Sequence, residues 1–319
     1  MMKQPLIILT GPTASGKTAL SVMLAKRIGG EIISADSMQV YRHMDVGSAK
    51  VTKEEMDGIP HHLIDVLEPQ DAFHVVIFKE MAEKAIKQIY RNGHIPIVAG
   101  GTGFYIQALL YDVDFTENDG DMHYRRSLEM LAKEQGPGVL HEMLKKVDPP
   151  SAEAIHENNM KRVIRALEFY EKTGKRISDH NEAERKKESP YTFAYYVLTM
   201  DRARLYERID ARVDKMLSDG LEEEVKKLKA MGCTRDMVSM QGLGYKEMLD
   251  CLNGNLSPEE AVYIIKRDTR HFAKRQLTWF KRERDVTWID QEEFSCDRER
   301  ILDWMLVDLE KRGMIGKQW

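Results

Sequence analysis

The sequence predicts an α/β fold in which a parallel sheet with a phosphate-binding loop is flanked by helices and interrupted by a helical insertion domain. Three observations predict it. Residues 11–18 read Gly-Pro-Thr-Ala-Ser-Gly-Lys-Thr, which fits the pattern G-x-x-x-x-G-K-[ST] between an apolar strand and a helix. The first 114 residues alternate strand and helix patterns, as parallel sheets covered by helices do. From residue 115 the alternation gives way to short helical patterns, and a strand pattern returns at residue 193.

We therefore expect a catalytic core with the phosphate loop and the C-terminal helices, formed by residues 1–114 and 193–319, and a helical insertion at 115–192. The first elements of the core are expected in the order strand 6–10, helix 19–28, strand 31–35, short strand 62–66, helix 73–92, strand 95–99 and helix 104–111. Because parallel strands place their carboxyl ends at one edge of the sheet, residues 11–18, Asp36 and Thr102 are expected to lie together there.

The insertion has weaker patterns. Residues 115–121 are acidic and turn-like, and short helices follow that are broken by glycine and proline. A stronger helix is expected at 158–173, and the highly charged segment 177–190 is expected to be a mobile surface segment. A strand at 193–200 then returns to the sheet, and helices dominate from there to the C-terminus.

Composition excludes several classes of protein. The chain has 319 residues, enough for one large domain with an insertion, and its net charge of −4 restricts any nucleic-acid surface to a local patch. The three cysteines are scattered without a C-x-x-C pair, so neither a zinc site nor a disulfide framework is indicated. No apolar run approaches the ~20 residues that span a bilayer, and the first strand begins too early for a signal peptide. We expect a cytoplasmic protein without a membrane partner.

The loop at 11–18 has a clear chemical meaning. A strand, a glycine-rich turn and a helix N-terminus direct several backbone N–H groups and a positive dipole end at one point. Lys17 adds a positive charge, and the Thr18 hydroxyl is a ligand for Mg²⁺. The pattern predicts a bound di- or triphosphate without saying which.

Two further groups are expected at the same sheet edge. Asp36 follows the second strand, where a carboxylate can act as a general base or bind magnesium through water; an Asx turn or a helix N-cap is the alternative. Thr102 lies in Gly-Gly-Thr-Gly, where it can donate to a phosphate or to a substrate amine, or simply form a tight turn. Ordinary ATP hydrolysis is disfavoured, because strand 95–99 ends in glycines and not in a magnesium-binding acid.

A long helix after the capping box at Ser257 carries a second signal. One face has basic residues and the other has apolar residues, namely Arg267, Arg270, His271, Lys274 and Lys281 opposite Val262, Ile265, Phe272, Trp279 and Phe280. In a slightly acidic chain such a ridge is typical of contact with a nucleic-acid backbone, although a solvated face would look similar. The helix at 158–173 repeats the pattern with Lys161, Arg162 and Arg165.

Two segments stay open on their residues alone. Gln-Gly-Leu-Gly-Tyr-Lys-Glu at 241–247 is compatible with a base-contacting loop or with a helix start. Arg204, Arg208 and Arg212 recur at four-residue spacing on a helix, where they can clamp a polyanion or pair with nearby acids.

Six blocks occur in an order that resembles the bacterial tRNA dimethylallyltransferase (tRNA isopentenyltransferase) family over nearly the whole chain. They are Gly-Pro-Thr-Ala-Ser-Gly-Lys-Thr, Asp-Ser-Met-Gln-Val-Tyr-Arg, Gly-Gly-Thr-Gly-Phe-Tyr, Asn-Asn-Met-Lys-Arg-Val-Ile-Arg-Ala-Leu-Glu, Gln-Gly-Leu-Gly-Tyr-Lys-Glu and Arg-His-Phe-Ala-Lys-Arg-Gln-Leu-Thr-Trp-Phe. The resemblance implies transfer of a dimethylallyl group from dimethylallyl diphosphate to N6 of the adenosine just 3′ of the tRNA anticodon, with release of pyrophosphate. The family reuses an ATP-binding type of nucleotide-binding loop for an isoprenyl diphosphate.

The resemblance also implies roles for residues of this chain. The catalytic set is Asp36 as general base, Thr102 positioning the amine or a bridging oxygen, and Arg212 clamping pyrophosphate, with Arg208 as its competitor. The diphosphate would be held by Gly11, Pro12, Thr13, Ala14, Ser15, Gly16, Lys17 and Thr18, with Thr18 on the Mg²⁺ cofactor. The tRNA anticodon stem-loop would contact Asp36, Ser37, Met38, Gln39, Arg125, Met160, Lys161, Arg162, Val163, Ile164, Gln241, Tyr245, Lys246, Arg270, Lys274 and Lys281.

The insertion would then close over the anticodon arm, and a monomer is expected. Three rival functions remain at this point: an adenylate isopentenyltransferase acting on free AMP, ADP or ATP, a small-molecule kinase with the same loop, and an RNA-binding or nucleotide-sensing module without catalysis. The basic helix argues against the first, the missing acid after strand 95–99 against the second, and Asp36 and Thr102 beside an intact loop against the third.

Overall fold

The computed structural model describes residues 3–115 and 122–316. The chain forms two compact units, one made of Met1–Leu110 and Pro190–Trp319 and the other of Tyr111–Ser189. Most of the acidic segment expected at 115–121 lies outside the described residues. We refer to the first unit as the core and to the second as the insertion.

Six parallel strands form the sheet of the core, in the order β3-β2-β4-β1-β5-β6. Their bounds are β1 Gln4–Thr10, β2 Gly30–Ala35, β3 His61–His62, β4 Ile95–Gly100, β5 Tyr191–Thr199 and β6 Val286–Asp290. The central strands are apolar on both faces, as a sheet covered by helices on both sides requires. The predicted α/β class is confirmed.

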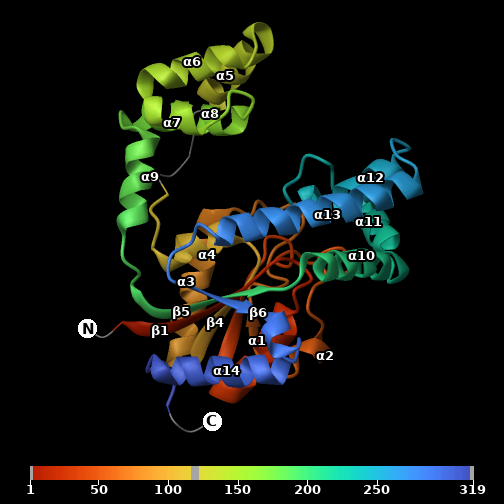
Figure 1. The fold of residues 1–319 in the computed structure, drawn as a ribbon. Coiled ribbons are helices and arrows are strands. Elements are labelled where there is room, and N and C mark those ends of the chain that lie inside the picture. The colour runs from red at the N-terminus through yellow and green to blue at the C-terminus, as the bar shows by residue number, and fades with distance from the viewer. Residues whose placement is uncertain (1–2, 116–121, 317–319) are drawn as a thin grey trace. The chain divides into compact units, whose positions relative to one another are not determined.

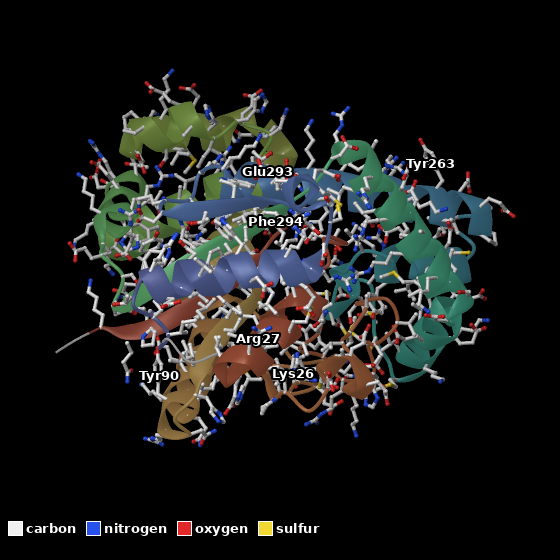
Figure 2. The ribbon with its side chains drawn as sticks, turned by 60° about the horizontal axis from the view of Figure 1, so that its bottom comes forward. Lys26, Arg27, Tyr90, Tyr263, Glu293 and Phe294 are labelled. Carbon is white, nitrogen blue, oxygen red and sulfur yellow. The ribbon has the colours of Figure 1, made fainter. Side chains whose placement is uncertain are left out.

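Helices lie on both faces of this sheet (Figure 1). They are α1 Lys17–Ile28, α2 Lys53–Met56, α3 Val75–Arg91, α4 Gly103–Leu110 and α14 Arg298–Lys311. Side chains of α1 and α14 share one buried cluster with β1, β4 and β5. Because right-handed crossovers from β1 to β2 and from β2 to β4 run in opposite directions along the sheet, α3 falls on the other face from α1. Lys26 and Arg27 lie in the last turn of α1, where their positive charges interact favourably with the negative end of the helix dipole (Figure 2).

The rest of the core is helical and covers the carboxyl edge of the sheet. Its helices are α10 Arg202–Ser218, α11 Leu221–Ala230, η1 Ser239–Gln241, α12 Tyr245–Leu252, α13 Pro258–Phe280 and η2 Gln291–Phe294. The capping box expected at the start of α13 is present: the Ser257 hydroxyl accepts from the Glu260 N–H at 3.1 Å, and the Glu260 carboxylate accepts from the Ser257 N–H at 2.8 Å. Ala273 and Leu277 pack α13 against Leu205 and Ile209 of α10.

Five helices form the insertion: α5 Met122–Gln135, α6 Gly138–Val147, α7 Pro149–Ala154, α8 Met160–Thr173 and α9 Ile177–Lys186. It has its own apolar core, which includes Leu140, Leu144, Val163 and Leu167. The stronger helix expected at 158–173 is therefore α8, which begins two residues later.

Sequence and structure differ in three places. The charged surface segment 177–190 contains a helix that was not predicted, because residues 177–186 form α9. The buried Asp148 carboxylate accepts from both the N–H and the hydroxyl of Ser178, at 3.0 and 2.6 Å, and so fixes the start of α9. The strand expected at 62–66 ends at His62, because Leu63 and Asp65 have φ angles of 63° and 54°, which no strand allows. Helices dominate after β5, as expected, and a sixth strand that the sequence did not predict, β6, lies among them.

Among the described residues, no helix is both long enough and apolar enough to cross a membrane.

Candidate active site

The phosphate loop connects β1 to α1 at the carboxyl edge of the sheet. Gly16 caps α1 with a φ of 88°, a left-handed conformation that favours glycine. Gly11 lies against β5, where a Cβ atom would come within 2.8 Å of the Leu198 carbonyl oxygen. These two positions explain the glycines of the motif, and α1 directs its free N–H groups into the loop.

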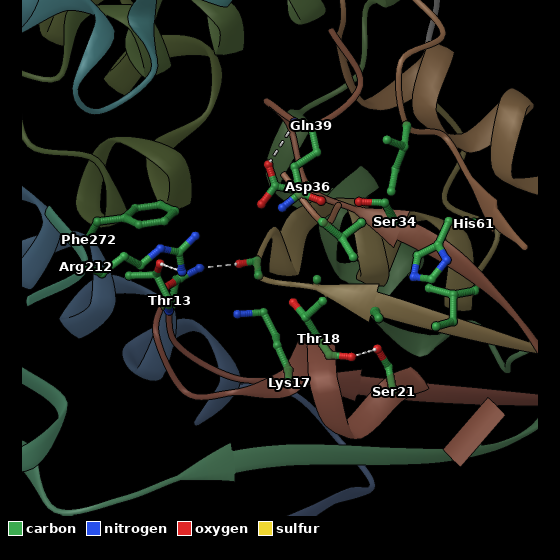
Figure 3. Close-up of a pocket in the computed structure, with 17 residues that line it drawn as sticks. Thr13, Lys17, Thr18, Ser21, Ser34, Asp36, Gln39, His61, Arg212 and Phe272 are labelled. Carbon is green, nitrogen blue, oxygen red and sulfur yellow. Dashed lines mark hydrogen bonds between the residues drawn. The ribbon is translucent and has the colours of Figure 1, made fainter. Parts of the chain in front are cut away.

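Lys17 crosses the loop, and its Nζ donates to the Pro12 carbonyl oxygen at 3.0 Å. Burial and the nearby Arg212 lower the pKa of Lys17 to about 8, although Asp36 opposes this. The Thr18 side chain is exposed and faces the same space as Lys17 and Asp36 (Figure 3). A cation that is held with too little compensating negative charge is prepared for an anionic ligand.

Asp36 follows the last residue of β2 and points toward the phosphate loop. Its Oδ1 accepts from the N–H groups of Met38 at 2.8 Å and Gln39 at 3.3 Å, so the Asx turn considered from the sequence is present. Its Oδ2 accepts no hydrogen bond from the residues that the structure describes. One oxygen therefore orients the carboxylate while the other remains available to a ligand.

Among the arginines of α10, Arg212 is the one that lines the cavity. Its Nη1 donates to the Thr13 hydroxyl at 3.3 Å, and burial lowers its pKa, although Asp36 and Glu55 oppose this. Arg208, one turn earlier on α10, lies outside the cavity lining and against Gly16, beside Arg298. The geometry thus favours Arg212 over Arg208 for a contact with a bound diphosphate.

The cavity has two connected compartments. The smaller, of about 80 Å³, is the polar compartment, and its lining includes Lys17, Thr18, Ser34, Asp36, Gln39 and His61. The larger, of about 430 Å³, is the apolar compartment, and its lining includes Phe73, Tyr105, Ile209, Val213, Met216 and Ile265. Thr13, Asp36, Gly101, Arg212, Phe272 and Gln276 line both. The combined space is of the size that small-molecule sites have.

Thr102 lies in the apolar compartment, as expected for the second glycine-rich turn. Its N–H donates to the Ala35 carbonyl oxygen at 3.2 Å, which ties the end of β4 to the residue before Asp36. The turn must be close-packed, because a Cβ atom on Gly100 would lie 2.3 Å from that same oxygen. The structure therefore brings all three predicted elements of the sheet edge together.

Helix α13 contributes residues that the sequence analysis missed. Phe272 was assigned to the face that packs against the protein, but it lines the cavity, and the Arg275 guanidinium lies 5.7 Å from the centre of its ring. Gln276 is buried between the two glycine-rich turns. A spacing of four residues places Phe272 and Gln276 on one helix face, and this was the available signal.

The predicted tRNA contacts divide into accessible and inaccessible groups. Ser37, Met38, Gln241 and Lys246 line the apolar compartment, and Gln39 lines the polar one. The exposed side chains are those of Met160, Lys161, Arg162, Lys274 and Lys281. Segment 241–247 contains a helix start, because α12 begins at Tyr245, while Gln241 at the end of η1 lines the apolar compartment. Contact with a base stays a prediction.

The other five predicted tRNA contacts are buried or bonded to acidic side chains of the protein itself. Val163 and Ile164 are buried in the insertion core, and the buried Tyr245 hydroxyl donates to the Glu224 carboxylate at 2.8 Å. Arg125 donates twice to Glu168, at 2.9 and 2.7 Å. Arg270 donates twice to Asp210, at 2.6 and 2.8 Å, so its charge on the α13 face is neutralised. Sequence spacing cannot show such partners, because they come from other helices.

The residues present fit a magnesium ion that is held largely by its substrate. The described residues contain no cluster of three histidine, cysteine, aspartate or glutamate side chains that could hold a metal alone. Mg²⁺ is usually bound by one or two protein ligands, water and substrate phosphates. The exposed Thr18 hydroxyl lines the polar compartment and matches this requirement.

Comparisons with known proteins show the family of the chain. The sequence model of the family described as IPP transferase matches residues 39–283. The chain is 59% identical over 308 residues to a tRNA dimethylallyltransferase of Lachnoclostridium phytofermentans, covering 97% of this chain and 98% of that protein. It is 52% identical over 303 residues to the tRNA dimethylallyltransferase of Carboxydothermus hydrogenoformans, covering 94% and 97%.

Solved structures give the same result. The tRNA isopentenylpyrophosphate transferase of Bacillus halodurans matches with a TM-score of 0.73 and 46% identity over 98% of each chain. A eukaryotic dimethylallyltransferase that acts on tRNA matches with a TM-score of 0.78 and 33% identity, over 90% of this chain and 74% of that one.

Proposed function

The chain belongs to the IPP transferase family of tRNA-modifying prenyltransferases, and we propose that it prenylates N6 of the adenosine just 3′ of the tRNA anticodon, using dimethylallyl diphosphate. The observation that carries this proposal is the shape of the cavity. A phosphate loop and a carboxylate face each other across a polar compartment, which opens into an apolar compartment of about 430 Å³. A diphosphate with an apolar tail and a purine require such a pair of environments.

The polar compartment would hold the diphosphate. The N–H groups of the loop, Lys17 and Arg212 supply donors and positive charge where the leaving pyrophosphate gains negative charge. Mg²⁺, with Thr18 as its protein ligand, would neutralise part of this charge. The C5 chain would then extend past Phe272 and Ile265 in the apolar compartment.

Asp36 would be the general base. Adenine N6 is a poor nucleophile because its lone pair is delocalised into the ring, so it needs a base and a fixed approach. The carbon–oxygen bond of the allylic diphosphate breaks with its electron pair leaving on pyrophosphate, the N6–carbon bond forms, and the N6 proton passes to Oδ2 of Asp36. Thr102 lines the same compartment and would orient the amine.

The reacting base must leave the anticodon-loop stack to reach this position. Exposed Lys274 and Arg275 on α13, Lys281 directly after it, and Lys161 and Arg162 on α8 would contact the RNA backbone. One chain lines both compartments, so we propose that a monomer is sufficient.

The decisive assay incubates the purified protein with radiolabelled dimethylallyl diphosphate and an unmodified tRNA that has adenosines on the 3′ side of its anticodon. AMP and a tRNA with that adenosine replaced are run in parallel. Label should enter only the first tRNA. Labelling of AMP instead would support the adenylate isopentenyltransferase, and tight ATP binding with phosphoryl transfer and no competition by dimethylallyl diphosphate would support the kinase.

A further inference from the structure

We propose that Gln276 is a positioning residue that locks the two glycine-rich turns of the cavity together and thereby sets the position of Arg212. Its Oε1 accepts from the Thr13 N–H at 2.8 Å, and its Nε2 donates to the Gly101 carbonyl oxygen at 2.9 Å. Only 6% of the residue is exposed. One side chain from α13 therefore bridges turns that are about ninety residues apart in the chain.

The bridge continues to Arg212 through Thr13. The Thr13 hydroxyl accepts from Arg212 Nη1 at 3.3 Å, while the Thr13 N–H is held by Gln276. Thr13 thus joins α13 to α10 and does not offer its own N–H to a ligand. The remaining N–H groups of the loop, Lys17 and Arg212 are left to bind the diphosphate, a role that rests on the function proposed above.

Packing at Gly101 supports a specific fit. A Cβ atom on Gly101 would lie 2.2 Å from Gln276 Nε2, so the side chain occupies the space that a larger residue would need. Gln276 also lines both compartments beside Phe272, one turn away on α13. A shift of this side chain would move the loop, the second turn and the cavity wall together.

A second buried glutamine provides a matched control. Gln291 on η2 is 5% exposed, and its Nε2 donates to the Ser15 carbonyl oxygen of the same loop at 3.1 Å. Among the described residues it lines neither compartment, and its hydrogen bond goes to the phosphate loop and not to the second turn. Loss of a loop contact as such should affect Gln276→Met and Gln291→Met alike, whereas loss of the bridge should affect only the former.

The experiment measures kcat and KM with dimethylallyl diphosphate and tRNA, the Kd of inorganic pyrophosphate by calorimetry, and Tm. We expect Gln276→Met to lower kcat/KM by about 10²-fold, because misplacing a reacting group by about 1 Å has an effect of this size. The Kd of pyrophosphate should rise by about tenfold. The kcat/KM of Gln291→Met should stay within about threefold of the wild-type value, although its Tm falls by as much as that of Gln276→Met. Equal losses of kcat/KM in the two variants would overturn the proposal.

Gln276→Glu adds a readout that a purely structural role would not move. Its carboxylate still accepts from Thr13 but repels the Gly101 oxygen unless it is protonated, so its kcat/KM relative to wild type should rise as pH falls. The titratable and charged residues Lys17, Asp36, His61, Arg212, Lys246 and Arg275 line the same cavity in both proteins, so the ratio reports the effect of the added carboxylate, including its effect on these groups. A ratio independent of pH would contradict the donor role of Nε2. If wild type binds pyrophosphate but not dimethylallyl diphosphate, the proposed function fails, and the pyrophosphate titration still tests Gln276.

Discussion

Strand β2 has a carboxylate at each end, and the two have opposite surroundings. Glu31, near the amino end, is 2% exposed and accepts from Asn92 at 2.9 Å, His94 at 2.6 Å and His62 at 2.7 Å. Burial alone would raise its pKa, but these hydrogen bonds outweigh burial and lower it to about 2. Asp36, after the carboxyl end, keeps one oxygen without a partner among the described residues.

The amino end of β2 therefore contributes to stability, and its carboxyl end contributes to the candidate active site. At the amino edge every oxygen of Glu31 is satisfied, so the charge stabilises the fold and has no capacity for a ligand. At the carboxyl edge the pKa values of Lys17 and Arg212 are lowered, because the effect of burial is larger than the opposing effect of the Asp36 charge. That edge is less stable than it could be until an anion binds.

The strongest test of this comparison is Asp36→Asn. Its Oδ1 can still accept from Met38 and Gln39, so the turn and the binding of both substrates should persist, while turnover falls by about 10²-fold or more through loss of the base. Single-turnover kinetics with saturating dimethylallyl diphosphate and tRNA measure this. Turnover near that of wild type would remove Asp36 from the base role.

Lys17→Met should act on binding. Removing a buried charge from its anionic partner costs about 2–5 kcal/mol, which corresponds to a loss of dimethylallyl diphosphate affinity of about 30-fold or more. Relief of an unfavourable buried charge should leave Tm unchanged or raised. Competition with pyrophosphate measures affinity, and a variant with wild-type affinity and reduced Tm would reverse the assignment of the two edges.

The pH dependence of binding follows from the same lysine. Its pKa of about 8 in the free protein lies below the ordinary 10.5, so the ammonium loses its proton as pH rises above 8 and affinity for pyrophosphate should decline there. Between pH 8 and pH 10.5 the unfolded chain binds more protons at Lys17 than the folded chain does. The free energy of unfolding of the free protein therefore rises with pH over this range. Titration of Lys17→Arg, which should keep its affinity to higher pH, is the control.

Glu31→Gln should show the reverse pattern. The folded pKa of about 2 lies below the ordinary 4.5, so the stabilisation is complete above pH 4.5 and is lost as pH falls toward 2. At pH 7 the variant should lose about 1–3 kcal/mol of unfolding free energy and keep its turnover. Urea unfolding measures the loss, and the gap from wild type should close in acid. A gap of equal size at pH 3 would contradict the charge-based account.

The smallest effect is expected outside the cavity. Replacing exposed Lys274 and Lys281 by Gln should reduce the slope of log K against log salt for tRNA by roughly 0.7–0.9 for each lost phosphate contact. Dimethylallyl diphosphate affinity should not change. Exposed Lys84 and Lys87 on α3 serve as the matched pair, and equal slopes in both double variants would show that the α13 face is only solvated.

Local patterns predicted the phosphate loop, Asp36 and Thr102, because a parallel sheet places strand ends together whatever the details of packing. They failed where a partner from a distant element decides the outcome. Asp148, thirty residues away in the chain, accepts a hydrogen bond from Ser178 at the start of α9. Asp210 on α10 forms an ion pair with Arg270 and neutralises its charge. Gln276 was missed because its four-residue spacing from Phe272 was read as part of the face that packs against the protein, and the two turns that it contacts come from distant parts of the chain. Strand β6 was not predicted because it follows a long helical stretch and lies at the edge of the described sheet, beside β5.

The place of β1 in the sheet has a consequence for synthesis of the chain. β1 pairs with β4 on one side and with β5 on the other, and about 180 residues separate Thr10 from Tyr191. At 5–20 residues per second a ribosome needs about 10–40 s to produce them. During that time one edge of the apolar strand β1 is unpaired, while the insertion, which is made in this interval, can form its own apolar core. Slow codons or destabilising changes in β5 should therefore appear as aggregation of nascent chains before they appear as a loss of catalysis.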